Sequence, residues 1–427
     1  MSQIFRSIPA VLLLALPLLG ASPEDNSDWN QWRGPKRDGH SPDTGLLKEW
    51  PAGGPALAWK ATGLGAGYSS VSVQGDRIFT MGDVGEDCSV FAMSLDGKIA
   101  WSAKVSRSSG PKDQGGYPGP RCTPSTDGAL VVALSAWGDL VCLNRADGKE
   151  KWRKNLVDDF GGRTPGWGYS ESPLIDGDTV VCIPGGKQGS VVALNKETGA
   201  TIWKSEALQG GAEYTSLMPT EIGGVKQYLV VTKGTCAGIA AKDGKVLWKG
   251  SHPGGTAVIA TPVYADGIVF MTVAYGVGCK AFKVAESGGA FTAETAYSDE
   301  GKEKKGARIM DNKTGGVIVV GEHVYGVTDG GKLKCVELKT GKVVWEDRCV
   351  GCKASVAFAD GHLVVRGEDG KGTIALVQAT PEGYKEKGRF DQPDRSKRTA
   401  WAHPVVIGGK LYVRDQDLLL CYDVKPK

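Results

Sequence analysis

The stretch SLDGKIAW at residues 94–101 decides the fold, because the same phrase returns along the chain at nearly constant intervals. In each copy an apolar strand leads into a turn built on Asp-Gly or Thr-Gly, and a second strand then ends in Trp. Further copies stand at residues 145–152, 196–203, 241–248 and 338–345. The first four tryptophans of this series are 51, 51 and 45 residues apart. A repeat of this length indicates a propeller or a solenoid.

Two further copies of the phrase are eroded. Trp248 and Trp345 are 97 residues apart, which is two periods, so we expect a copy between them with Phe291 near the Trp position. Another eroded copy places Phe390 at that position. One position of the repeat carries small residues that we expect in the core, namely Cys142, Ala193, Gly238, Cys335 and Cys421.

A second phrase alternates with the first and predicts β-hairpins. SVSVQGDRIFTM at residues 70–81 and SPLIDGDTVVCI at residues 172–183 each place a glycine turn between two alternating apolar strands. Such turns need positive backbone angles, which glycine adopts readily. Eight copies of this phrase can be counted, and one such hairpin plus one Trp phrase makes a four-stranded blade.

The two ends of the chain complete each other. LLLCYDV at residues 418–424 is a third strand with no fourth after it, whereas PALAWKA at residues 55–61 is a fourth strand with no blade before it. We therefore predict an all-β, eight-bladed β-propeller with Trp-docking repeats, closed by pairing of the N-terminal outer strand with the C-terminal blade, which hides exposed strand edges. The structural tryptophans of the motif are Trp59, Trp101, Trp152, Trp203, Trp248 and Trp345.

The N-terminus is typical of an exported protein. Arg6 precedes an apolar run at residues 8–19, which is too short to span a membrane, and small residues follow it. We expect a signal peptide at residues 1–21, a lead segment at residues 22–54 and a single propeller at residues 55–427. No Cys follows the apolar run. The mature product is therefore expected to be periplasmic or secreted, without a lipid-modified Cys or a transmembrane anchor.

The charge balance argues against nucleic-acid binding. The chain has 51 Lys plus Arg and 48 Asp plus Glu, a net charge of +3, so it offers no basic field for phosphates. The five histidines are scattered without a metal-binding pattern, which disfavours a zinc hydrolase. Cys349 and Cys352 form a CxxC between strands, and either a local disulfide or a pair of thiols fits this setting.

With the repeat established, the chain resembles the quinoprotein alcohol dehydrogenase-like superfamily, and more closely the secreted proteins with PQQ-binding-like β-propeller repeats. Besides the Trp phrases, the resemblance is carried by DWNQWRGPKRDGHSPDTGLLKEWP at 28–51, GWGYSESPL at 166–174 and HPVVIGGKLYVRDQDLLLCYDV at 403–424. It covers nearly the whole mature chain. The superfamily includes dehydrogenases that use pyrroloquinoline quinone (PQQ) with calcium, and a non-catalytic outer-membrane assembly scaffold.

The chain departs from both of these relatives. The dehydrogenases carry two adjacent cysteines that form a lid over the quinone, and no two cysteines are adjacent here. They are also longer, with inserted segments that wall the quinone site. The scaffold is a lipoprotein, whereas this sequence has no modifiable Cys after its apolar run.

Ligands of propellers usually bind at a mouth of the central channel, among the loops that join each outer strand to the next inner strand. These loops carry aromatic and arginine side chains that suit an anionic, sugar-like or planar ligand. Polar loops around a propeller mouth are also commonly just solvated. The candidate ligand-binding residues are Arg121, Arg163, Trp167, Tyr169, Glu171, Tyr214, Arg308, Asn312, Trp401 and His403.

The candidate cofactors are PQQ and calcium, and neither is required by the sequence. Glu171 and Asn312 offer oxygens for calcium, with Asp311 or Asp415 as a base. Isolated acidic residues are more often solvated or paired, and in the run YVRDQD at residues 412–417 a buried ion pair or a clamp between blades is the simpler interpretation of Asp415.

Two functions remain open from the sequence. The first is a non-catalytic binding or scaffold propeller of the cell envelope or secreted space, working as a monomer with a protein, glycan or small-molecule partner at the channel mouth. The second is a compact dehydrogenase of an alcohol or sugar that uses PQQ and calcium. Fold alone does not decide between them, because function depends on the site.

Overall fold

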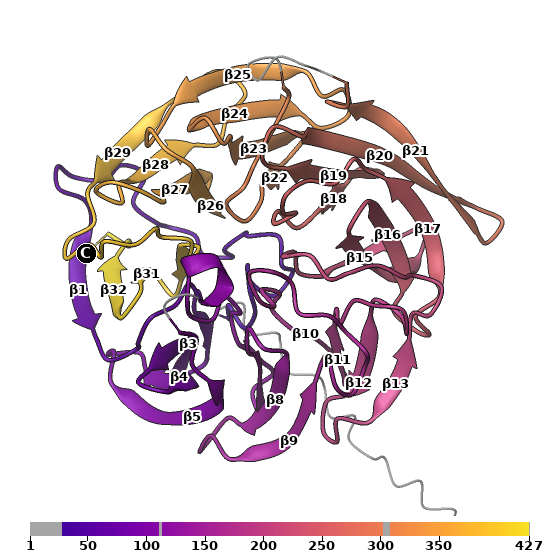
Figure 1. Cartoon of the computed structure of the whole chain (residues 1–427). Helices are drawn as coiled ribbons and strands as arrows, with labels where there is room; N and C mark the ends of the chain where they lie inside the picture. Colours follow the sequence, from indigo (N-terminus) through magenta and orange to yellow (C-terminus); the bar gives the residue numbers. More distant parts are fainter. Residues whose placement is uncertain (1–27, 111–112, 302–307, 427) are drawn as a thin grey trace, which may run out of the picture.

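The computed structural model describes residues 28–110, 113–301 and 308–426. Within these residues the chain forms eight antiparallel sheets of four strands each, arranged around a central axis (Figure 1). The eight-bladed β-propeller predicted from the repeats is confirmed. The expected signal peptide at residues 1–21 lies outside the described residues.

Each blade runs outward from the axis to the rim in the same strand order. The innermost strands are β2 (Ser72–Gln74), β6 (Ser125–Thr126), β10 (Leu174–Asp176), β14 (Met218–Ile222), β18 (Val263–Ala265), β22 (Ile318–Val320), β26 (Ala354–Ala359) and β30 (Val405–Ile407). The second strands are β3 (Arg77–Val84), β7 (Leu130–Leu134), β11 (Thr179–Cys182), β15 (Val225–Thr232), β19 (Ile268–Val273), β23 (His323–Val327), β27 (His362–Gly367) and β31 (Lys410–Asp415).

The remaining strands complete the blades toward the rim. The third strands are β4 (Asp87–Ser94), β8 (Asp139–Asn144), β12 (Val192–Asn195), β16 (Thr235–Ala240), β20 (Gly278–Ser287), β24 (Lys332–Glu337), β28 (Ile374–Gln378) and β32 (Leu418–Asp423). The outermost strands are β5 (Ile99–Arg107), β9 (Glu150–Asn155), β13 (Thr201–Lys204), β17 (Val246–Ser251), β21 (Ala290–Ser298), β25 (Val343–Arg348), β29 (Glu386–Phe390) and β1 (Ala56–Ala61).

The last blade is built from both ends of the chain. β1 pairs antiparallel with β32, which places Trp59 opposite Cys421. β32 in turn pairs with β31, and β31 with β30. One sheet therefore ties the first strand of the chain to the last, so that unfolding one end of the chain opens the ring.

Tryptophans within the outermost strands dock onto the following blade. The indole Nε1 of Trp152 donates to the Lys196 carbonyl at 2.8 Å, in the turn of the next blade, and its ring lies under Gly199. The same indole-to-carbonyl bond is made by Trp59, Trp101, Trp203 and Trp345. Each bond satisfies a polar atom while the ring covers apolar surface between two blades. The docking role expected of the motif is thus visible in its geometry.

The small core residues that the repeat predicts lie directly opposite these rings. Cys142 pairs with Trp152, Ala193 with Trp203 and Cys335 with Trp345, and all three small residues are fully buried. A larger side chain at this position would compete with the ring for space, because protein interiors are close-packed. The prediction of small core residues is confirmed.

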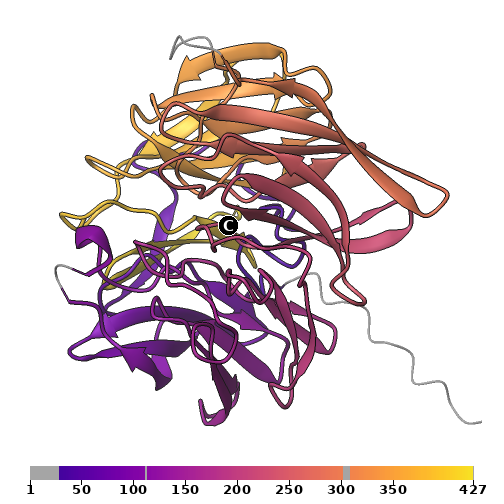
Figure 2. The same ribbon diagram turned by 45° about the vertical axis from the view of Figure 1, so that its right-hand side comes forward.

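The eroded fifth blade corrects one expectation. Tyr297, and not Phe291, takes the docking position, since Tyr297 lies opposite Ala281, donates its hydroxyl to the Leu338 carbonyl at 2.6 Å and packs under Gly341. The hairpin of β20 and β21 is lengthened and projects beyond the rim (Figure 2), which moves the docking position six residues further along the chain.

The two remaining aromatic positions of the repeat are Phe390 and Trp248. Phe390 packs under Gly54, as expected of a residue that replaces the Trp. Trp248 donates its Nε1 to Gln227 Oε1 at 2.7 Å in its own blade, because the next turn belongs to the lengthened hairpin. Gly288 of that turn has no neighbouring atom that a side chain would meet.

The lead segment crosses the propeller face opposite the loops that enter each blade. Trp29 forms a β-bridge with Val73, and His40 forms one with Phe358 on a distant blade. Between them Arg37 donates to the Ser172 carbonyl at 2.7 Å, and Arg33 donates to the Val317 carbonyl at 2.5 Å. Both arginines are buried. Since Ser172 and Val317 belong to different blades, residues 28–40 close one end of the channel.

We expect the docking contact to be sensitive to a single methyl group. Gly199 and Gly177 both have positive φ, 69° and 58°, but a Cβ on Gly199 would lie 2.9 Å from the Trp152 ring, whereas a Cβ on Gly177 meets nothing. Both alanine variants pay the same backbone strain. Gly199→Ala should therefore lower the free energy of unfolding by about 1–3 kcal/mol more than Gly177→Ala in urea denaturation. Equal losses would contradict the docking.

Candidate functional site

A cavity of about 280 Å³ opens at the end of the channel that the lead segment leaves free. It lies among the loops that join outer strands to the next inner strands, as the propeller architecture predicts. The side chains and backbone that line it come from all around the ring and from the lead segment. They are Trp32, Tyr68, Ser70, Tyr117, Arg121, Thr123, Trp167, Ser170, Tyr214, Ser216, Ala257, Ile259, Tyr275, Lys313, Thr314, Gly315, Trp401 and His403.

One wall is a group of aromatic rings around Trp401. The Trp401 ring lies 4.4 Å from that of Tyr68 and 4.9 Å from that of Tyr117, with interplanar angles of 32° and 37°. The indole Nε1 of Trp401 donates to Glu368 Oε2 at 2.9 Å, which fixes the ring from behind. Three loops that are distant in the sequence therefore present one continuous aromatic surface.

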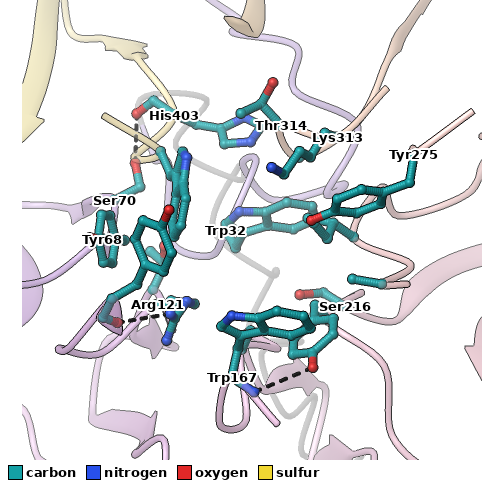
Figure 3. Close-up of a pocket in the computed structure, with 18 residues that line it drawn as sticks. Trp32, Tyr68, Ser70, Arg121, Trp167, Ser216, Tyr275, Lys313, Thr314 and His403 are labelled. Carbon is teal, nitrogen blue, oxygen red and sulfur yellow. Dashed lines mark hydrogen bonds between the residues drawn. The ribbon is translucent and has the colours of Figure 1, made fainter. Parts of the chain in front are cut away.

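Trp32 forms the base of the cavity and comes from the lead segment. Figure 3 shows its ring lying across the middle of the site, between His403 and Trp167. The guanidinium carbons of Arg33 and Arg37 lie 5.5 Å and 5.9 Å from the centre of the ring. Cation–π attraction of this kind helps to hold the ring in place.

Arg121 and Lys313 supply the positive charge of the cavity. Arg121 donates to the Tyr117 carbonyl at 2.9 Å and to Gln114 Oε1, and its guanidinium lies 5.4 Å from the Tyr68 ring. Burial lowers the pKa of Arg121 to about 10, so the group stays charged at neutral pH. Lys313 Nζ lies 4.9 Å from the centre of the Tyr275 ring.

His403 is neutral at physiological pH and tightly packed. Burial, together with the charges of Arg33 and Arg366, lowers the pKa of His403 to about 3. A Cβ added to Gly315 would lie 1.8 Å from Nε2 of His403, so the imidazole packs directly on the glycine backbone. A group with this pKa exchanges protons poorly near neutral pH.

Five of the ten candidate residues line this cavity and five do not. Those that line it are Arg121, Trp167, Tyr214, Trp401 and His403. The side chains of Trp167 and Tyr214 contact each other edge to face at 5.7 Å. Arg163 is exposed and Arg308 is half-buried, and neither lines the cavity.

The other three candidates are structural parts of the core. The Tyr169 hydroxyl donates to the Pro184 carbonyl at 2.9 Å, and the Asn312 amide donates to the Val327 carbonyl at 2.8 Å. Glu171 Oε1 accepts the N–H of Ile183 at 2.6 Å. All three are buried, because the strands that follow them start at the ends of these loops and draw them into the blade core.

Trp32, Tyr68, Tyr275 and Lys313 also line the cavity but were not among the residues predicted from the sequence. Tyr68 lies between an outer and an inner strand, so the loop rule that selected the other candidates applies to it as well. Trp32 belongs to the lead segment, and no local pattern places that segment inside the channel. Tyr275 lies in the turn between β19 and β20, which opens to the same face.

The residues expected to bind calcium do not fit that role. Glu171 and Asn312 are both buried and neither lines the cavity, so their oxygens are not presented to a ligand at the channel mouth. The Asn312 oxygen already accepts the N–H of Gly316 at 2.9 Å. Across the described ranges, no group of three or more His, Cys, Asp or Glu residues is arranged to hold a metal ion.

Neither of the two candidate bases, Asp415 and Asp311, lines the cavity. Asp415 forms an ion pair with Arg395 at 2.6 Å and accepts hydrogen bonds from Gln392 and Ser396. It therefore clamps the loop before β30, in agreement with the clamp that the sequence suggested. Burial and the neighbouring Asp329 raise the pKa of Asp311 to about 6, but Asp311 does not line the cavity.

Comparison with known proteins identifies the family. A family model described as outer membrane protein assembly factor BamB matches residues 86–302 and 292–382. The chain belongs to this BamB family. The BamB of Shewanella oneidensis is 22% identical over 360 residues, which is 74% of this chain and 86% of that protein. The BamB of Alkalilimnicola ehrlichii is 27% identical over 206 residues, 48% of each chain.

Solved structures share the fold of this BamB-family chain. BamB from Moraxella catarrhalis superposes with a TM-score of 0.61 at 15% identity, covering 86% of this chain and 99% of that one. The quinohemoprotein alcohol dehydrogenase from Comamonas testosteroni gives 0.64 at 12% identity, covering 94% and 81%. The resemblance to PQQ-like propellers is confirmed. No helix in the described part of the chain is long and apolar enough to cross a membrane.

The buried carboxyl of Glu171 makes the stability of this propeller depend on pH. Its pKa is raised in the folded state, so its contribution to stability is complete below about pH 4.5 and is lost as pH rises through about 8. Glu171→Gln mimics the protonated acid and should remove this loss in the free energy of unfolding, which is on the order of several kcal/mol. Denaturation at acidic and at alkaline pH measures the difference. The exposed Glu221→Gln is the control. Parallel pH profiles for Glu171→Gln and wild type would refute the assignment.

Proposed function

We propose that this chain is a non-catalytic binding propeller of the cell envelope or secreted space, which recognises its partner at the channel mouth. Membership of the BamB family supports the proposal, since its curated relatives are named outer membrane protein assembly factors. The apolar run at residues 8–19 supports export, and we propose a monomer whose mature form begins after residue 21.

The observation that carries the proposal is the chemistry of the cavity lining. No Asp, Glu or Cys is among the lining residues that the structure describes, and the imidazole of His403 has a pKa of about 3. Acid–base catalysis near neutral pH needs a group that exchanges a proton in that range, within reach of the substrate. The lining offers rings and cations for binding, which suits recognition better than proton transfer.

The alternative is a PQQ- and calcium-dependent dehydrogenase of an alcohol or sugar. The shared propeller fold keeps this alternative open, but the side chains do not favour it. Glu171 and Asn312 are buried outside the cavity lining, and Asp415 is held in an ion pair. The adjacent cysteines of the quinone lid are absent from the sequence.

Titration with the quinone separates the two functions. We expect no saturable binding of PQQ with calcium to the purified protein, followed by absorbance and by thermal shift, and no dye-linked oxidation of alcohols or sugars. The matched control is a PQQ-dependent alcohol dehydrogenase treated in the same way. Saturable binding together with substrate-dependent dye reduction would establish the dehydrogenase and refute the scaffold proposal.

A further inference from the structure

Two exposed tyrosines extend the cavity lining onto the rim of the channel mouth. Tyr117 is 38% exposed and Tyr275 is 43% exposed, and both also line the cavity. Tyr117 lies in the loop between β5 and β6, whereas Tyr275 lies in the turn between β19 and β20, on a different side of the ring (Figure 1). An occupant confined to the cavity would leave both rings partly in water. The aromatic surface therefore fits a partner that reaches in from outside.

The lining has the composition of a protein-recognition site. Three tryptophans, Trp32, Trp167 and Trp401, line the cavity together with four tyrosines and Arg121. Protein–protein binding energy concentrates on Trp, Tyr and Arg, because each combines a large contact surface with a polar group. The mouth therefore offers anchoring positions for the side chains of a partner protein.

Two hydroxyl groups of the lining keep their protons available for a ligand. Ser216 Oγ accepts the N–H of Ser172 at 3.0 Å, and Tyr214 Oη accepts the N–H of Trp167 at 3.4 Å. Since both oxygens act as acceptors in these bonds, each O–H can still donate. An extended polypeptide presents carbonyl oxygens that accept such bonds. The lining can therefore bind the main chain of a partner as well as its side chains.

The mouth carries positive charge that no lining carboxylate neutralises. Within the described chain, Arg121 donates to two carbonyls and one side-chain amide, all of which are neutral. Lys313 lies against the ring of Tyr275. Arg398 is exposed and donates to the Gly116 carbonyl at 3.1 Å, beside the rim. Complementary charge steers association, so the mouth favours a negatively charged partner.

The carboxylates that adjoin the lining do not cancel this charge from within the cavity. Each of three such carboxylates accepts a hydrogen bond from a lining residue or from its neighbour. They are Glu368 on Trp401, Asp329 on Tyr275 and Glu213 on Val258. None of the three lines the cavity, so its inner surface has no negative side chain among the described residues.

We infer that the mouth binds an extended, acidic segment of a partner protein, which places one apolar side chain in the cavity and carboxylates on Arg121 and Lys313. Figure 3 places these two cations on different sides of Trp32, so a segment that crosses the mouth reaches both. A cavity of about 280 Å³ has room for a large side chain and excludes a folded domain. The inference rests on the proposed function, because it names the kind of partner bound at the same mouth.

Calorimetric titration of the purified full-length protein with a synthetic peptide tests the inference. The probe peptide is capped at both ends and has one leucine flanked on each side by two glutamates. In three matched peptides, glutamines replace the glutamates, lysines replace the glutamates, or alanine replaces the leucine. We expect the probe to bind tightest, about tenfold or more tighter than the glutamine peptide, because the latter makes no charged hydrogen bond.

Two variants remove the cavity charges one at a time. Arg121→Gln and Lys313→Gln should each lower the preference for the probe over the glutamine peptide several-fold. Lys313→Gln keeps the hydrogen bonds by which Arg121 holds its own loop, so it separates the effect of charge from that of loop structure. Lys242→Gln is the matched control, since Lys242 is exposed in the turn between β16 and β17, on the opposite face of the propeller.

The outcomes separate this inference from the proposed function. A preference for the probe over all three matched peptides, lowered in both cavity variants and not in Lys242→Gln, supports the inference. Equal binding of the glutamate and glutamine peptides, a preference unchanged in either cavity variant, tighter binding of tetragalacturonate, or no binding in the millimolar range overturns it and leaves the proposed function standing. Quinone-dependent oxidation in the separate titration would refute the proposed function, and this inference with it.

Discussion

The docking of an aromatic ring beneath the turn of the next blade is the contact on which the structure depends. It joins neighbouring blades of the described ring except after Trp248, and at its regular copies it combines a ring, a glycine and a small residue opposite the ring at fixed positions. That requirement explains why the repeat is visible in the sequence and why it predicted the eight-bladed fold. The repeat predicted Phe291 in place of Tyr297 at the docking position of the fifth blade, because the lengthened hairpin of β20 and β21 shifts the ring away from the expected spacing.

The lead segment closes one end of the channel through this ring of blades. Arg33 and Arg37 bind backbone carbonyls on separate blades, and Trp32, held between them, turns its ring into the channel. Without this segment the channel would be open at both ends. Buried arginines that bind only carbonyls keep their charge at a cost in desolvation, so they are expected where a fixed geometry matters. The base of the binding cavity thus depends on how the lead segment packs against the blades.

The sequence located the cavity in outline because loop order in a propeller places every loop from an outer to an inner strand at one face. Residues within those loops were harder to assign. Tyr169 and Glu171 stand only a few positions from Trp167, yet they point into the blade core, since the inner strand begins soon after them. Trp32 was not predictable, because its position depends on tertiary contacts with blades that are far away in the sequence.

The most direct test of a cavity based on Trp32 and charged by Arg121 is a crystal structure of the full-length protein. The account predicts an open cavity with the Trp32 ring at its base and the Arg121 guanidinium in its wall. A Trp32 ring turned out of the channel, or a cavity that the side chains of the loops fill completely, would contradict it.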